Sequence, residues 1–153
     1  MKMTKMLVVL LGAGFAVGCG GDDLSSVQAQ ITSATSGFDA TCPAPYYARF
    51  ALELKGLTED AASQPVVERL QVIRNGDDAL LIDMPSGDIT IDRQSAPSAV
   101  TLQGEGRSIS ETPGSGDGVY KTRMEITIRL GDGTRTLTSQ AFDSGWGHIN
   151  CQP

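Results

Sequence analysis

The sequence predicts an all-β protein: an antiparallel meander of about seven strands that forms a small barrel-like sheet or a sandwich. Three observations predict this class. From residue 42 onward, apolar and polar residues alternate with a period of two, no long stretch has helical periodicity, and glycine-containing turn sequences separate the alternating segments. Because the turns are short, most neighbouring strands should form hairpins. Of the two architectures, the barrel is favoured.

The clearest strand runs from Tyr120 to Leu130, where apolar side chains alternate with charged or hydroxyl ones. The segment Arg49–Lys55 alternates in the same way and predicts a half-buried strand with one wet face. Further strands are expected at residues 66–74, 78–84, 88–94, 98–104 and 134–142. The side chains expected to fill the core are Phe50, Leu52, Leu54, Leu80, Ile82, Met124, Ile126 and Ile128.

Three turn sequences separate these strands. Asn75-Gly76 predicts a hairpin with a type I′ turn, because that turn needs positive φ at both central residues. Gly131-Asp132-Gly133 predicts another hairpin by the same chemistry. The segment 85–87 (Pro-Ser-Gly) should break the chain between two short strands.

The amino terminus has the layout of an export signal. Lys2 and Lys5 precede an apolar run over residues 6–17, which is too short for a good permanent membrane anchor. The segment 16–19 (Ala-Val-Gly-Cys) resembles the lipobox of bacterial lipoproteins, although Leu is usual where this chain has Ala16. The resemblance implies cleavage between Gly18 and Cys19 and a diacylglyceryl group on Cys19, with acyl chains such as palmitate. An ordinary cleaved signal peptide is the alternative.

This interpretation divides the chain into three parts: a signal peptide (1–18), a lipidated N-terminus and flexible tether (19–41), and a single β domain (42–153). The tether is expected because residues 20–37 are small, polar and rich in Ser, Thr and Gln. A short docked helix is the alternative, since Leu24, Val27 and Ile31 have helical spacing. In enterobacterial-type lipoproteins an Asp after the lipidated Cys favours the inner membrane, so Gly20 indicates the outer membrane.

The three cysteines can be assigned together. If Cys19 carries lipid, Cys42 and Cys151 remain as an even pair in an oxidising compartment. A disulfide between them would close most of the domain into one loop and contribute up to about 4–5 kcal/mol. Two free thiols are the alternative.

Charge and composition exclude several classes of function. The formal net charge is −6, and loss of Lys2 and Lys5 leaves 10 cations against 18 anions, so the mature chain is near −8. A nucleic-acid-binding protein needs a concentrated basic surface, which this balance argues against. A single His with three Cys excludes a multi-ligand zinc finger, and the Asp-Gly steps lack the spacing of a calcium loop. We therefore expect no metal and no cofactor.

No catalytic motif emerges from the sequence. Ser144, His148 and Asp143 are the residue types of a catalytic triad, but closeness in sequence is no sign of triad geometry. Glu53 and Glu125 could be paired glycosidase carboxylates, although solvated strand faces explain them better. The glycine-rich segment 104–118 lacks a phosphate-loop pattern and is expected to be a mobile loop, or a loop that binds a partner.

We therefore expect a non-enzymatic, lipid-anchored protein of the cell envelope and periplasm, located at the outer membrane. Its β domain would serve binding or structural interaction. The expected partners are the membrane, through the lipid on Cys19, and an envelope protein. The alternative is a carrier of a small apolar ligand inside a lipocalin-like barrel. The Gly-Trp pair usual near the first strand of that family occurs here only at Gly145-Trp146, near the end of the chain.

Overall fold

The computed structural model describes residues 26–39, 44–57, 65–96, 99–108 and 118–147. These residues form nine strands and one short 3-10 turn, so the all-β prediction is confirmed. In chain order the elements are β1 (Gln28–Phe38), β2 (Tyr46–Lys55), β3 (Val66–Arg74), β4 (Leu80–Pro85), η1 (Ser86–Asp88), β5 (Ile89–Ala96), β6 (Ala99–Ser108), β7 (Gly118–Leu130), β8 (Gly133–Thr138) and β9 (Phe142–Trp146).

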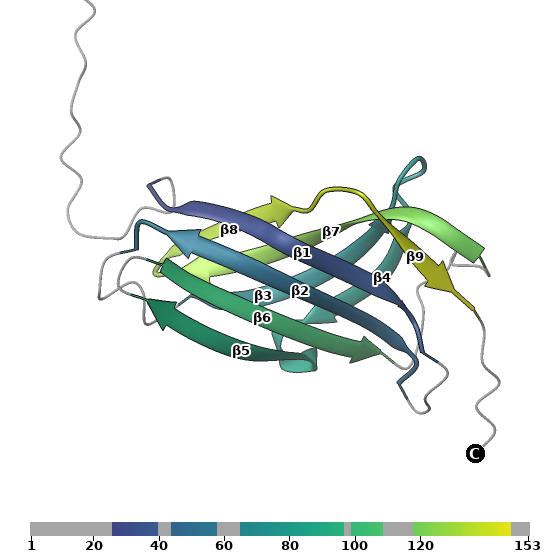
Figure 1. Ribbon diagram of the computed structural model, residues 1–153, viewed down its shortest axis with the longest axis horizontal. Helices are drawn as coiled ribbons and strands as arrows, with labels where there is room; N and C mark the ends of the chain where they lie inside the picture. Colours follow the sequence, from purple (N-terminus) through teal and green to yellow (C-terminus); the bar gives the residue numbers. More distant parts are fainter. Residues whose placement is uncertain (1–25, 40–43, 58–64, 97–98, 109–117, 148–153) are drawn as a thin grey trace, which may run out of the picture.

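The strands form two antiparallel sheets that pack face to face as a sandwich (Figure 1). The first sheet has the order β1-β2-β6-β5, and the second has the order β4-β3-β7-β8, with β9 also paired to β7. The preference for a barrel was wrong. The connections that follow β2, β4 and β6 each carry the chain to the other sheet, so successive hairpins stack in two open layers instead of closing into one sheet.

The core lies between the two sheets and is made by the inward half of each alternating strand. Seven of the eight predicted core side chains are buried there. Leu80 is only half-buried, because a register shift between Val72 and Ile73 brings Leu81 inside instead. Each fully buried Leu or Ile contributes about 1.5–3 kcal/mol relative to an exposed one, so this layer dominates the stability of the fold.

The predicted turns are present, and one is longer than expected. Gly131 (φ +56°) and Asp132 form a two-residue turn between the paired residues Leu130 and Gly133. At Asn75-Gly76 the hairpin is present, but four residues separate Arg74 from Ala79, whose carbonyl accepts the Arg74 N–H. A two-residue type I′ turn therefore does not form. Residues 86–88 form η1 and link β4 to β5 in the other sheet.

The largest difference from the expected organisation lies at residues 28–38, where the sequence predicts a tether. They form β1, an edge strand that pairs with β2 along its whole length, so neither a tether nor a docked helix occupies these residues. The sandwich thus begins well before the expected boundary at residue 42. The Ala29, Ile31 and Ala34 side chains pack against the core, which explains why this polar segment is ordered as a strand.

A second difference lies in the predicted strand 134–142. It is divided into β8 and β9 by residues 139–141, and both strands pair with the same edge of β7. The lipobox residues Gly18 and Cys19, the cysteines Cys42 and Cys151, His148 and residues 109–117 lie outside the described residues. The loop expected over 104–118 was wrong at its start, because residues 104–108 continue β6 and pair with β2.

Candidate functional site

The candidate site lies at the sandwich edge where β1 of the first sheet faces β8 and β9 of the second. The two sheets meet at both ends of β1. At one end the Arg135 guanidinium donates a hydrogen bond to the Val27 carbonyl (3.0 Å). At the other end a Cβ built on Gly37 would lie 3.0 Å from the Gly145 carbonyl oxygen, so the two backbones nearly touch.

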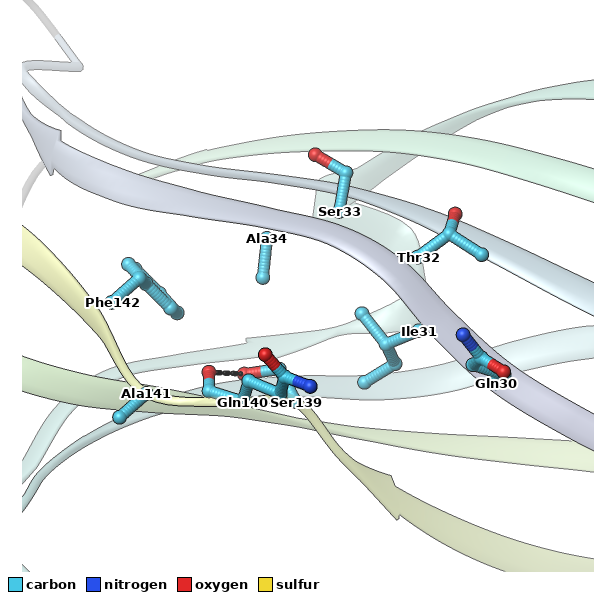
Figure 2. A pocket seen from close by; sticks show the side chains of 9 residues that line it. All are labelled: Gln30, Ile31, Thr32, Ser33, Ala34, Ser139, Gln140, Ala141 and Phe142. Carbon is cyan, nitrogen blue, oxygen red and sulfur yellow. Dashed lines mark hydrogen bonds between the residues drawn. The ribbon is translucent and has the colours of Figure 1, made fainter.

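Between these two contacts the edges separate and leave a slit of about 220 Å³. We use "the slit" for the space lined by Gln30, Ile31, Thr32, Ser33, Ala34, Ser139, Gln140, Ala141 and Phe142. Figure 2 shows Ile31 and Ala34 on the side of β1 that faces the β8–β9 segment, whereas Thr32 and Ser33 project from the other side. The half-buried Ile31, Ala34 and Phe142 give the slit an apolar floor.

Both borders of the slit depart from regular strand geometry. On β1 the pairing with β2 shifts between Ile31 and Ser33, and the extra residue, Thr32, donates its hydroxyl to the Ala51 carbonyl (3.2 Å). This β-bulge bends the edge strand at the middle of the slit.

On the opposite border, where the pairing of β8 with β7 ends, Ser139 hydrogen-bonds the backbone of Met124 in β7. Its backbone N–H donates to the Met124 carbonyl (2.9 Å), and its hydroxyl accepts the Met124 N–H (2.9 Å). The same hydroxyl donates to the Gln140 carbonyl (2.8 Å), the bond drawn in Figure 2. Ser139 thus satisfies Met124 without a strand partner and frees residues 140 and 141 to border the slit.

A buried polar chain fixes the aromatic side of the slit. The Trp146 indole donates to the Ser144 hydroxyl (2.8 Å), which lies 3.1 Å from the Thr122 hydroxyl. Thr122 donates its one proton to the Phe142 carbonyl (3.2 Å), so Ser144 must donate to Thr122. This chain ties the Phe142 backbone to β7 and sets the position of its ring.

An aromatic cluster closes the sandwich beyond the Gly37 end of the slit. Tyr46 stacks on Trp146 with ring centroids 5.7 Å apart, and Phe38 packs on Tyr46 at 5.6 Å. The Tyr46 hydroxyl donates to the Gly147 carbonyl (3.3 Å). The three rings come from β1, β2 and β9, so they fasten the two sheets together at this end.

The slit is electrically neutral, since none of its nine lining residues has a charged side chain. Elsewhere the outer faces of both sheets carry ion pairs. Hydrogen bonds from Arg69 lower the pKa of Asp83, and hydrogen bonds from Arg49 lower the pKa of Glu105. These charged groups are satisfied by their own neighbours, which distinguishes those faces from the slit.

The residues considered for a catalytic triad are not arranged as one. Ser144 and Asp143 are consecutive in β9, so their side chains lie on opposite faces. Ser144 is 2% exposed and bonded within the core, whereas Asp143 is exposed and pairs with Lys121 (2.8 Å). Consequently, these two side chains cannot act together on one substrate.

The two glutamates considered as glycosidase carboxylates are also apart. Glu53 lies on the outer face of the first sheet beside Lys55 (3.0 Å), and Glu125 lies on the outer face of the second beside Arg123 (3.1 Å). The buried core separates them, so they do not flank a common site. Within the described ranges, no three His, Cys, Asp or Glu side chains are placed to hold a metal ion.

Sequence reasoning missed the slit because its residues are neutral and carry no catalytic motif. A search for matching protein-family models and for similar curated proteins found none. In the part of the chain that the structure describes, no helix is long and apolar enough to span a bilayer.

Proposed function

We propose that the protein is a lipid-anchored component of the cell envelope whose β-sandwich is a non-catalytic binding module, with the slit as its binding site. The observation that carries the proposal is the slit itself, which combines an apolar floor, a neutral polar rim and an adjoining edge strand. The export signal and the lipobox-like residues that end at Cys19 support the location.

The alternative, a carrier of a small apolar ligand, has less support. Such a carrier needs an internal cavity, as in a closed barrel. Here the space between the sheets is occupied by the packed side chains of the core, and the sheets remain open at their edges. The slit lies at the surface, and its volume is below the roughly 300–1,000 Å³ usual for small-molecule pockets.

A photo-crosslinking experiment in cells tests both parts of the proposal. A photoreactive amino acid replaces Gln140 at the rim of the slit, and in a matched variant it replaces Gln94 on β5, the far edge strand of the first sheet; both positions are exposed. We expect irradiation to give discrete adducts from position 140 and none from position 94, all in the membrane fraction. With Cys19→Ala added, the protein should leave that fraction.

The two parts can fail separately. Adducts of equal kind and yield from both positions would rule out the slit as the binding site. A Cys19→Ala chain that still sediments with membranes would rule out the lipid anchor without bearing on the slit.

A further inference from the structure

We propose that the slit binds an extended peptide segment of another protein, which adds as a strand to the free edge of β1 and places uncharged, apolar side chains on the slit floor. This inference rests on the proposed binding role of the slit and goes further, because it names the class of partner. It does not depend on the lipid anchor.

The first argument is the chemistry of the β1 edge. Among the described residues β1 pairs with β2 alone, so one row of its backbone N–H and C=O groups has no strand partner. Edge strands are usually protected from further pairing by charged residues, by proline or by a β-bulge. β1 has the bulge at Thr32 but no charged residue and no proline in its 11 residues. The other edge strands carry Asp83 in β4, Asp92 and Arg93 in β5, Arg135 in β8 and Asp143 in β9.

The second argument is the floor beside that edge. Ile31 and Ala34 of β1 face the slit together with Phe142 of β9 (Figure 2). In strand addition, main-chain hydrogen bonds supply affinity, and pockets for alternate side chains supply specificity. A volume of about 220 Å³ has room for one or two aliphatic side chains of an added strand.

The third argument is charge. The nine lining residues are uncharged, and a charged side chain placed on the floor would lose its hydration without gaining a counterion. The alternate side chains that point into the slit must therefore be neutral. The length of the segment is also limited, since the five β1 residues from Gln30 to Ala34 span about 17 Å.

The closed ends of the slit favour a separate peptide over a second copy of this chain. Arg135 covers the Val27 end of β1, and β9 covers the Gly37 end. A second sandwich would bring its own β8 and β9 against these same obstructions. A single extended segment, from a loop or a terminus, is thin enough to enter between them.

The test uses the purified full-length chain and a phage-displayed library of random linear heptapeptides. Selected peptides are synthesised, and their affinity is measured by titration calorimetry for the wild type and three variants. Ala34→Leu fills the floor, and Gln140→Lys puts a charge on the rim. Gln94→Lys places the same charge on β5 as a matched control.

We expect peptides with uncharged, apolar residues at alternate positions. Their binding should weaken at least about tenfold with Ala34→Leu and with Gln140→Lys but change less than about twofold with Gln94→Lys. Bound peptide should slow amide hydrogen exchange in residues 30–34 and leave β5 unchanged. Urea unfolding shows whether each variant is folded. If Ala34→Leu is not folded, the affinity of the exposed Gln140→Lys variant tests the inference.

Three results would overturn the inference: a selection that enriches no peptide, peptides that bind the wild type and both slit variants equally, or a consensus in which neither set of alternate positions is uncharged. Dimerisation of the chain that Gln140→Lys abolishes would identify a second copy as the occupant and also refute it. If crosslinks form at position 140 in cells but no peptide binds, the binding site stands and the partner class is wrong.

Discussion

Two buried serines show how the contribution of a hydroxyl to folding stability depends on its hydrogen-bond partners. Ser144 accepts from Trp146 and donates to Thr122 inside the core. Ser36 of β1 is also buried, at 5% exposure, but its hydroxyl has no hydrogen-bond partner within the described part of the chain. A buried polar group without a partner loses its hydration and gains nothing in return.

The same substitution should therefore have opposite effects at the two positions. Ser144→Ala leaves the Trp146 N–H without its acceptor and should destabilise the fold by about 1–3 kcal/mol. Ser36→Ala removes an unsatisfied group and should stabilise the fold by up to about 1 kcal/mol. Urea unfolding of the two variants measures both, and a loss of stability in Ser36→Ala would show that its hydroxyl has a partner after all.

At the scale of single elements, Gly104 of β6 is a position where the inner face of the first sheet is tightly packed. It pairs with Phe50 of β2, whose ring lies over it in place of a side chain. A Cβ there would lie 2.2 Å from the Phe50 ring and 2.9 Å from Ile91. Ile91 is 36% exposed and can move aside, but Phe50 is 4% exposed and is held by the core.

Gly104→Ala should consequently destabilise the protein by about 1–3 kcal/mol through overpacking. In a Phe50→Leu background the same change should cost less, because the shorter side chain leaves room. Gly145→Ala is the control: nothing lies within 4 Å of its added Cβ, and stability should change by no more than about 0.5 kcal/mol. Differential scanning calorimetry compares these chains with their parents, and an equal cost of Gly104→Ala in the wild-type and Phe50→Leu backgrounds would contradict this account.

The elements differ in how far the sequence could predict them. The segment Tyr120–Leu130 alternates without interruption, and it forms the long central strand β7. β1 has the same inward alternation, but the bulge at Thr32 shifts it by one residue, and its inward positions include the weakly apolar Ala29 and Ala34. Under those conditions a search for period-two alternation does not detect the strand. The helical spacing of Val27 and Ile31 then wrongly indicates a helix.

The slit was beyond prediction for a related reason. Its borders are a bulge in one sheet and a strand break in the other, and each depends on a hydrogen bond, from Thr32 to Ala51 and between Ser139 and Met124. Neither bond has a signature in the sequence. The residues that meet there are about a hundred positions apart, and only the stacking of the two sheets brings them together.

At the scale of the whole molecule, the sandwich consists of two units of four strands with the same arrangement, β1–β4 and β5–β8. β1–β4 place one hairpin in each sheet, β5–β8 repeat that arrangement, and β2 pairs with β6 as β3 pairs with β7. Turn sequences identify hairpins locally but do not say which layer each hairpin joins. This explains why alternation and turns predicted the all-β class correctly and the barrel wrongly.

The Cys42–Cys151 disulfide stays a prediction, and described residues near the two cysteines lie close together. The bond from Tyr46 to Gly147 joins positions four residues after Cys42 and four before Cys151, and the Tyr46–Trp146 stack holds them together. A disulfide needs Cα atoms about 4.4–6.8 Å apart, a separation that two such short flanks can reach from this junction.

Under denaturing, non-reducing conditions we therefore expect no alkylatable thiol at Cys42 or Cys151. Cys42→Ser should lower the free energy of unfolding by about 2–5 kcal/mol, and adding Cys151→Ser should lower it no further. Mass spectrometry after alkylation counts the free thiols, and urea unfolding measures the free energy of unfolding. Two labelled cysteines in the wild type would refute the bridge.

The early start of β1 also limits the distance at which the protein can work. Ser26, the first described residue, lies seven positions after Cys19, a length of chain that reaches at most about 25 Å. With a lipid on Cys19, as proposed, the slit can stand no farther than about 50 Å from the bilayer surface. Its reach is then shorter than a long tether would give, so a partner fixed in the same membrane can fill the slit only if its peptide stands within about 50 Å of the bilayer surface.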